Sequence, residues 1–343
     1  MDFPQIISFT VLNACNLRCK MCGQWSETGY VKNKIIDANL KLEVNEWKRL
    51  VDEISHHKVK FILLRGGEPF LYPGIMELIE YINRKGIFLS IDTNGTIIKK
   101  FAADLIRLGN MHITFSVDGP EHIHDEVRGK QGSFKEIKQN IALFNELERK
   151  INKKLSKSIC FTISKYSYRG LGDMPAVAMD MGITSINIVP YYFFSSKTGE
   201  EYELELKENF NTSAYSWKGF YNENSGIDFE IFKKEYETYL SNLNGIENFP
   251  FMPLNLNEYQ TWFDNPNTIV GSTNCMNIES LIDIQPNGDA NFCIDFPDYS
   301  FGNIKESSIK EIWNSEKAEK FRSYRREKPL ATCYRCGAKY CSE

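Results

Sequence analysis

The chain has 343 residues, enough for one large domain or two ordinary ones, each with its own hydrophobic core. Hydrophobic residues make up 42% and charged residues 25%, which is typical of globular proteins and excludes wholesale disorder. The 41 basic and 45 acidic residues give a net charge of -4, which disfavours general nucleic-acid binding. No apolar run is long enough to span a membrane, and the N-terminus lacks a secretory signal. We therefore expect a cytoplasmic protein that binds neither membrane nor nucleic acid.

Short apolar runs alternate with amphipathic stretches from residue 5 to about residue 190. The apolar runs predict six strands, at Ile6–Leu12, Val59–Leu64, Ile87–Asp92, His112–Val117, Ser158–Ile163 and Ile183–Val189. The amphipathic stretches predict helices, at Glu43–His56, Gly74–Arg84, Lys99–Leu108, Phe134–Lys150 and Gly170–Met181. This alternation is typical of a parallel α/β sheet whose strands are buried on both faces. Because a full barrel needs eight such units, six predict an open, partial (β/α)6 TIM-like barrel.

The pattern changes after Pro190. Residues 191–269 are rich in aromatic side chains and show no strand–helix alternation, so we expect a bridge or insertion in which Glu200–Glu208 is a solvated helix face. From about residue 270 a compact unit begins, with a hairpin signal around the turn at residues 286–289. A helix over Ser308–Tyr324 follows it. The predicted domains are therefore residues 1–190, 191–269 and 270–343.

Nine cysteines are the unusual feature of the composition. Cys160 stands alone in the middle, and the others lie towards the two ends, at Cys15, Cys19, Cys22, Cys275, Cys293, Cys333, Cys336 and Cys341. An odd number of thiols in a reducing compartment is a poor disulfide framework. Clustered thiols in such a protein indicate metal or iron–sulfur ligands.

The first group, Cys15, Cys19 and Cys22, has the spacing C-x3-C-x2-C and follows the first predicted strand. A loop at that place lies on the C-terminal rim of a parallel barrel, where active sites are built. Three thiolates can hold three irons of a four-iron cluster and leave the fourth iron open. The alternatives are a zinc site or buried structural thiols. Zinc fits less well because no fourth His or Cys is near in the sequence.

Polar or glycine-rich breaks follow the next three strands, at residues 65–69, 93–95 and 116–119. Turns between strands need Gly and Asn in any case, so each break alone is unremarkable. In a parallel sheet, however, all three meet at the same rim as the cysteines. We therefore expect one site that combines thiols, a glycine-rich backbone surface, a carboxylate and hydroxyl groups.

With these features residues 5–190 resemble the radical SAM superfamily, on the strength of the three cysteines and the sequence Gly66-Gly67-Glu68-Pro69. The resemblance implies that S-adenosylmethionine (SAM) chelates the open iron, and that Gly66–Pro69 meet its methionine amine, with Glu68 as an acceptor. It also implies contacts to the rest of SAM from Asn94, Ser116, Asp118 and the segment around Val189. Arg128 is a further candidate for a carboxylate contact, and the alternative is a surface arginine.

The second cysteine group resembles the SPASM/twitch extension of radical SAM enzymes. The resemblance rests on the cysteine spacing and on three segments, Asp289–Cys293, Phe301–Ile304 and Ile309–Trp313. It implies auxiliary four-iron clusters. The full SPASM pattern has seven cysteines and two clusters, whereas this chain has five. We therefore expect one auxiliary [4Fe-4S] cluster, as in the twitch type, with Cys275, Cys293, Cys333 and Cys336 as ligands. Cys341 is spare or replaces Cys336, and a four-cysteine zinc site is the alternative.

Cys160 lies inside the fifth predicted strand. It is either a buried core thiol, as free cysteines commonly are, or, if it faces the barrel lumen, a hydrogen-atom donor to a substrate radical.

The resemblance implies an enzyme that reductively cleaves SAM to a 5′-deoxyadenosyl radical, which abstracts hydrogen from an unactivated C–H bond. A closed apolar lumen under the aromatic bridge would shield the radical from water. A reducing donor such as flavodoxin or ferredoxin is the expected partner.

The substrate class rests on two observations. The extension has the cysteine count of a one-cluster type, and the cysteine motif begins at residue 15, without the N-terminal recognition domain of many peptide-modifying relatives. Both favour dehydrogenation or epimerisation of a small polar, sugar- or nucleotide-like substrate. A peptide-modifying maturase is the close alternative. A non-catalytic iron–sulfur or zinc protein is disfavoured, because it has no use for a SAM amine site.

Overall fold

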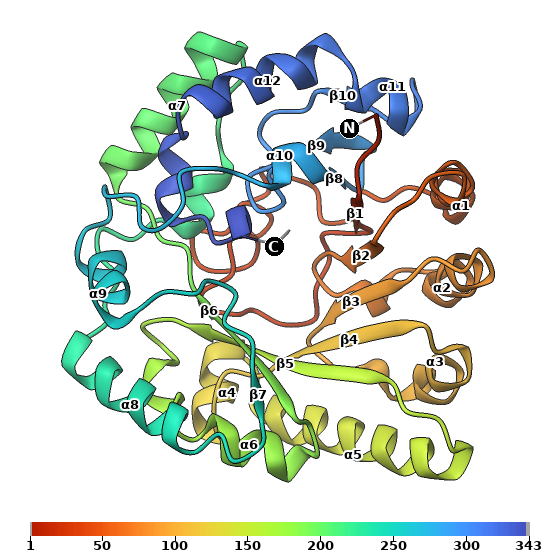
Figure 1. Ribbon diagram of the computed structural model, residues 1–343, viewed down its shortest axis with the longest axis vertical. Coiled ribbons are helices and arrows are strands. Elements are labelled where there is room, and N and C mark those ends of the chain that lie inside the picture. Colours follow the sequence, from red (N-terminus) through yellow and green to blue (C-terminus); the bar gives the residue numbers. More distant parts are fainter. Residues whose placement is uncertain (1, 341–343) are drawn as a thin grey trace.

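The computed structural model describes residues 2–340. Its strands form one ten-stranded sheet in the order β10-β9-β8-β1-β2-β3-β4-β5-β6-β7 (Figure 1). The strands that run in parallel are β8 (Leu281–Ile284), β1 (Ile6–Thr10), β2 (Phe61–Arg65), β3 (Leu89–Thr93), β4 (Met111–Ser116), β5 (Ser156–Ile163), β6 (Ser185–Pro190) and β7 (Glu247–Asn248). Strands β9 (Asp289–Asn291) and β10 (Gly302–Asn303) are antiparallel.

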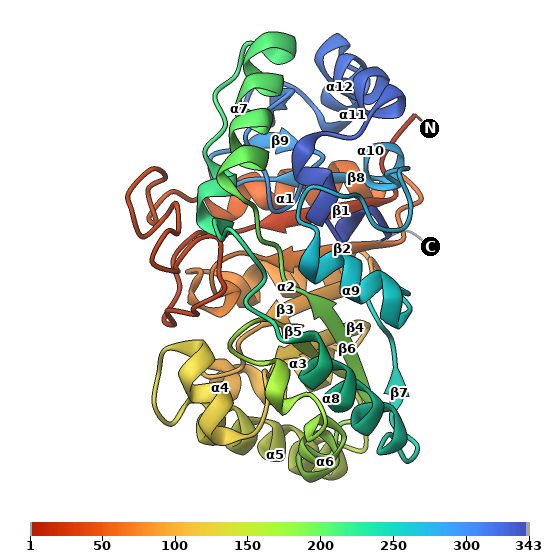
Figure 2. The same ribbon diagram turned by 90° about the vertical axis from the view of Figure 1, so that its left-hand side faces the viewer.

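All six predicted strands are present, as β1–β6. Among the described strands, β7 and β10 are the two edges of the sheet and do not pair with each other, so the barrel is open. This confirms the partial-barrel prediction. Figure 2 shows the loop after β1 and helix α4 (Glu121–Arg128) on the same side of the sheet, where the parallel strands end.

Helices cover the outer face of the curved sheet (Figure 1). They are α1 (Val44–Ser55), α2 (Ile75–Arg84), α3 (Ala102–Leu108), α5 (Ser133–Ile151) and α6 (Met174–Met181), all predicted from the sequence. In α1 the buried residues Trp47, Leu50, Val51 and Ile54 form the apolar stripe that faces the sheet. Helix α4 was not predicted, because it has no such stripe and its buried residues include His124, Asp125 and Arg128.

The inner and outer faces of strands β3–β6 differ sharply. Outward side chains such as Ile91, Ile113 and Phe161 are fully buried beneath the helices. The inward side chains are polar apart from Val189 on β6, namely Ser90, Asp92, His112, Thr114, Ser116, Ser158, Cys160, Thr162, Ser185 and Asn187. The prediction of a closed apolar lumen is therefore wrong for these strands. The physical reason is that the helices cover only the outer face, whereas the inner face borders a cavity.

The C-terminal region continues the barrel sheet. The predicted hairpin is present as β8 and β9, but β8 also pairs in parallel with β1, with Ser8 opposite Asp283. The predicted helix over Ser308–Tyr324 is two helices, α11 (Ile309–Trp313) and α12 (Glu316–Glu327). The chain breaks between them because Ser315 caps α12, its hydroxyl accepting a hydrogen bond from the Ala318 N–H.

The bridge contains α7 (Ser196–Phe210), α8 (Phe229–Ser241), α9 (Leu256–Asp264) and the short strand β7. The expected helix face at Glu200–Glu208 lies within α7. Helix α7 packs on α12 through Phe210, whose ring centroid lies 5.4 Å from that of Phe321. The helix α10 (Asn277–Ser280) leads into β8. No helix in the described part of the chain is both long and apolar enough to cross a membrane.

Candidate cofactor and substrate site

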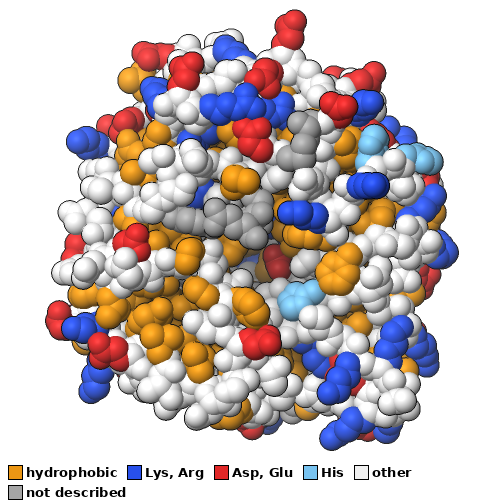
Figure 3. Space-filling view, in the orientation of Figure 1, with side chains coloured by type: hydrophobic (Ala, Val, Ile, Leu, Met, Phe, Trp, Pro, Cys, Tyr) orange, Lys and Arg blue, Asp and Glu red, His pale blue; other side chains and the backbone are white. Residues whose placement is uncertain are grey.

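The N-terminal thiols line a large cavity that begins at the C-terminal ends of the strands and continues through the lumen. Its volume is about 1780 Å³, and Cys15, Cys19 and Cys22 all border it. The loop after β1 carries the three cysteines. Figure 3 shows a central hollow on the viewed face, with an acidic side chain in its depth and a histidine at its edge.

Nitrogen donors point at the sulfurs of this triad. The Leu17 N–H lies 3.5 Å and the Asn94 Nδ2 lies 3.9 Å from the Cys15 Sγ. The Arg128 Nη1 lies 3.8 Å from the Cys19 Sγ. Burial raises the pKa of Cys15 to about 12 and that of Cys19 to about 11, and nearby thiols add to both increases. Thiols surrounded by such donors fit an iron–sulfur cluster, which stabilises the thiolates that burial alone disfavours.

Gly66 and Gly67 bring a second segment against the cysteine loop. A Cβ at Gly66 would lie 2.4 Å from the Leu12 carbonyl oxygen, and one at Gly67 would lie 2.2 Å from that of Ala14. The Gly67 N–H also donates to the Leu12 carbonyl at 2.8 Å. Only glycine permits this approach, and both residues line the cavity beside the thiols.

Glu68 has a different place from the one that the resemblance implied. Its side chain is fully buried and does not border the cavity. Its carboxylate accepts hydrogen bonds from the Phe70 N–H at 3.1 Å, the Thr93 hydroxyl at 2.8 Å and the Asn94 N–H at 2.8 Å. Burial raises the pKa of Glu68 to about 7. Glu68 therefore braces the turn that presents Asn94, and Pro69 likewise lies outside the cavity lining.

Asp118 is also a supporting residue and not a cavity-lining one. Its Oδ2 pairs with the Arg128 Nη2 at 2.7 Å, and its Oδ1 accepts the Thr162 N–H at 3.0 Å. Arg128 ends helix α4, is only 7% exposed and borders the cavity. The alternative of a surface arginine is therefore wrong, and the implied direct contact of Asp118 with SAM is replaced by an ion pair that orients Arg128.

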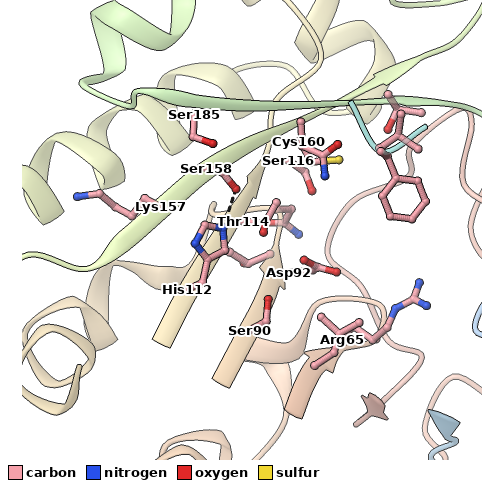
Figure 4. Close-up of a pocket in the computed structure, with 18 of the residues that line it drawn as sticks. Arg65, Ser90, Asp92, His112, Thr114, Ser116, Lys157, Ser158, Cys160 and Ser185 are labelled. Carbon is pink, nitrogen blue, oxygen red and sulfur yellow. Dashed lines mark hydrogen bonds between the residues drawn. The ribbon is translucent and has the colours of Figure 1, made fainter. Parts of the chain in front are cut away.

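The remaining candidates reach the cavity directly, because Asn94, Ser116, Cys160 and Val189 all line it. Ser116 lies opposite Cys160 in the β4–β5 register, and Figure 4 shows the two side chains next to each other in the lumen. Cys160 thus faces the lumen and does not pack beneath the helices. Burial raises its pKa to about 12.

Four lumen residues were missed by the sequence analysis. Arg65 Nη2 pairs with Asp295 Oδ1 at 3.0 Å, which joins β2 to the segment after Cys293. Asp92 lies one strand away on β3. His112 contacts the Ser156 hydroxyl at 2.7 Å and the Ser158 hydroxyl at 2.8 Å through its two ring nitrogens. For Asp92 and His112 the signal was present as polar residues at every second position of β3–β5, a period that predicts one polar face. Arg65 and Asp295 lie outside these strands and carried no such signal.

The C-terminal thiols meet at a separate, smaller cavity. Cys275, Cys293, Cys333 and Cys336 line it together with Arg325 and Lys339. Burial, followed by the charges of the other three thiols, raises the pKa of Cys293. Four thiols beside two cations fit an anionic iron–sulfur cluster. In the described part of the chain, no three His, Cys, Asp or Glu side chains are arranged to hold a single metal ion. Cys341 lies outside the described residues.

Comparison with known proteins gives a family match to each cysteine region. Residues 9–163 match the radical SAM superfamily, and residues 275–337 match an iron–sulfur cluster-binding domain called SPASM. The Fe-coproporphyrin III synthase of Methanosarcina barkeri is 29% identical over 51% of this chain and 40% of its own length. The sporulation killing factor maturation protein SkfB of Bacillus subtilis is 29% identical over 42% of this chain. The chain spans only 33% of the length of SkfB.

Solved structures share the fold. SuiB of Streptococcus suis bound to its precursor peptide SuiA has a TM-score of 0.68 at 17% identity, over 98% of this chain and 71% of SuiB. The anSMEcpe structure with bound AdoMet has a TM-score of 0.60 at 16% identity, over 92% of this chain and 82% of that chain. The matched domains imply SAM with a [4Fe-4S] cluster at its site, and auxiliary iron–sulfur ligation at the C-terminus. The chain therefore carries a radical SAM domain over residues 9–163 and a C-terminal SPASM iron–sulfur domain over residues 275–337.

Proposed function

We propose that this chain is a radical SAM enzyme that removes a hydrogen atom from a small polar substrate held in the barrel lumen. The observation that carries the proposal is the single cavity that runs from the cysteine triad into a lumen with polar walls on β3–β6. Its volume of about 1780 Å³ exceeds the roughly 300–1000 Å³ of an ordinary ligand pocket. SAM and a second small molecule therefore both have room.

In this proposal Cys15, Cys19 and Cys22 hold the cluster at the SAM site. When bound, cluster and SAM supply a 5′-deoxyadenosyl radical that can attack an unactivated C–H bond. The SAM-lining residues are Gly66, Gly67, Asn94, Ser116, Arg128 and Val189. Glu68 and Asp118 are positioning residues. Glu68 holds the backbone of Asn94 in place, and Asp118 orients the Arg128 guanidinium towards Cys19.

The bridge shields this chemistry from water. Tyr192 and Phe220 line the cavity, and their ring centroids lie 5.6 Å apart in an edge-to-face contact. Phe296, from the segment after Cys293, lies 5.5 Å from Phe220. Asp298 fixes this arrangement, because its carboxylate accepts hydrogen bonds from the Tyr215 and Ser216 N–H groups at 2.7 and 3.0 Å. A water-poor site suits a reactive radical.

The C-terminal site would hold one auxiliary cluster through Cys275, Cys293, Cys333 and Cys336. Its place next to the lumen suits exchange of an electron with the substrate, and a donor such as flavodoxin or ferredoxin would supply reducing equivalents. We keep the predicted regions 1–190, 191–269 and 270–343 as functional units, although β8 belongs to the barrel sheet.

Two fates of the substrate radical differ in the role of Cys160. In dehydrogenation the substrate radical would give one electron to the oxidised auxiliary cluster and release a proton. In epimerisation the Cys160 S–H gives a hydrogen atom to the substrate radical, and the external donor then reduces the sulfur radical. The lumen position of Cys160 beside Ser116 supports the second route.

A peptide substrate is the second candidate, favoured by specific relatives. SkfB is a maturation protein, and the SuiB structure contains a precursor peptide. The lumen would then take a single side chain of the peptide.

The test begins with anaerobic reconstitution, reduction and measurement of 5′-deoxyadenosine. Formation of this product is expected, and its absence from a fully iron-loaded protein would contradict the proposal. Once a substrate is known, turnover in deuterated water separates the two fates. Deuterium in the product that disappears in Cys160→Ala establishes hydrogen donation, whereas an oxidised product without deuterium establishes dehydrogenation.

A further inference from the structure

Carboxylates outnumber cations in the immediate surroundings of Arg65, where Asp92 and Asp295 line the cavity and Asp283 lies behind its wall. The charges of Asp295, Asp283 and Asp92 all act on the Arg65 guanidinium. Arg65 is committed to Asp295 by the 3.0 Å ion pair. Arg128, which borders the same cavity beside the cysteine triad, is paired with Asp118. A cation entering this space would therefore be attracted, and more strongly than in bulk water, because the low-dielectric protein around a cavity concentrates the field of its charges.

Asp92 is the carboxylate that this arrangement leaves without an ion-pair partner. No Lys, Arg or His nitrogen of the described residues lies within 4.0 Å of its carboxylate. Its side-chain hydrogen bond comes from Thr114, on the neighbouring strand. Figure 4 shows Asp92 projecting into the lumen while the Arg65 guanidinium extends away from it. A carboxylate can accept several further hydrogen bonds.

The surroundings of Asp92 are suited to a polar ligand. Asp92, Thr114 and Ser158 are register partners across β3, β4 and β5 and form one row on the lumen wall. Ser116, Cys160 and Asn187 form the next row, nearer to the strand ends that carry the cysteine loop. The Asn187 Oδ1 is buried and has no hydrogen-bond partner among the described residues. Both rows thus offer acceptors that a donor-rich ligand would satisfy.

We propose that Asp92 anchors an ammonium or guanidinium group of the substrate, an inference that rests on the proposed function. Two residues along a strand span about 7 Å, which separates the Asp92 row from the Cys160 row. A substrate held at Asp92 would therefore present a carbon a few bonds from its cationic group to the SAM side of the lumen. The substrate class is a small polar amine or guanidine, or a basic side chain of a peptide.

Three probes of similar length test this assignment on the reconstituted protein with SAM and without reductant. They are 4-aminobutanol, 1,4-butanediol and 4-hydroxybutyrate, which are cationic, neutral and anionic. Binding is measured by anaerobic titration calorimetry. We expect 4-aminobutanol to bind about tenfold or more tightly than the diol, as a charge-assisted hydrogen bond predicts. We expect 4-hydroxybutyrate to bind more weakly than either.

Asp92→Asn keeps the shape of the side chain and should abolish the preference for the amine. Glu247→Gln is the matched control, because Glu247 is exposed at the far rim of the same cavity and its loss should leave the preference intact. Equal binding of the three probes to the native protein overturns the inference, and so does a preference that survives Asp92→Asn. If Asp92→Asn does not fold, the probe series on the native protein decides. Failure to form 5′-deoxyadenosine contradicts the proposed function separately, whatever the probes show.

Discussion

The two cysteine sites differ in number of thiols and in openness. The N-terminal site has three thiols on the wall of a cavity of about 1780 Å³, whereas the C-terminal site has four thiols around a small enclosed space. An incomplete thiol set beside a large cavity leaves room for an exchangeable ligand, as catalytic metal sites do. A complete, enclosed set leaves none and suits a structural or electron-transfer role. The contrast therefore favours catalysis at the N-terminal site and a structural or electron-transfer role at the C-terminal site.

Removing one set of thiols at a time gives the largest expected effect. The native protein should hold about eight irons after anaerobic reconstitution, as two four-iron clusters. Replacing Cys15, Cys19 and Cys22 together with Ala should halve the iron and abolish SAM cleavage. Cys333→Ala should also lower the iron content, but the SAM-site cluster should remain. Iron analysis and 5′-deoxyadenosine assays check both. Zinc in the C-terminal site would contradict the auxiliary-cluster assignment.

Each site also has a buried arginine beside a thiol, and the two should differ in their effect on stability. Arg128→Met removes the ion-pair partner of the fully buried Asp118, so we expect a loss of about 3–5 kcal/mol in unfolding free energy. Arg325 donates to the Thr273 carbonyl at 2.8 Å and has no carboxylate partner among the described residues. Arg325→Met should therefore cost less, about 1–3 kcal/mol. Anaerobic denaturation of both variants at equal iron loading measures the difference. Equal losses of unfolding free energy in the two variants would contradict the expected difference between the two arginines.

The smallest expected effect concerns Glu68, which has no counterpart at the C-terminal site. Glu68→Ala removes the acceptor for three hydrogen bonds and loosens the turn that carries Asn94. We expect SAM affinity to fall about tenfold, or about 1.4 kcal/mol, while the iron content is retained. Glu68→Gln keeps part of this bonding and should lose less. Unchanged SAM affinity in Glu68→Ala would contradict the positioning role.

The sequence correctly predicted those elements whose local hydrophobic pattern matches their burial in the tertiary structure. Six strands and five outer helices follow from apolar periodicity, because the same side chains that set the period are buried against the sheet. The three thiols of Cys15, Cys19 and Cys22 follow from spacing alone, since one short loop carries them. Helix α4 was missed because His124, Asp125 and Arg128 are buried through hydrogen bonds and charge, which hydrophobic pattern does not report.

The sequence by itself determined the parallel sheet, the common rim and the two cysteine sets. These depend on residue type and spacing within single segments. Only the tertiary structure decided which side chains line the cavity and which are buried behind its wall. Glu68 and Asp118 match a motif, yet both are held away from the cavity by partners on other elements, Thr93 for Glu68 and Thr162 for Asp118. Arg65 and Asp295 are 230 positions apart and meet because the C-terminal strand β8 joins the barrel sheet next to β1. Long-range contacts of this kind depend on the packing of whole elements, which no local pattern encodes.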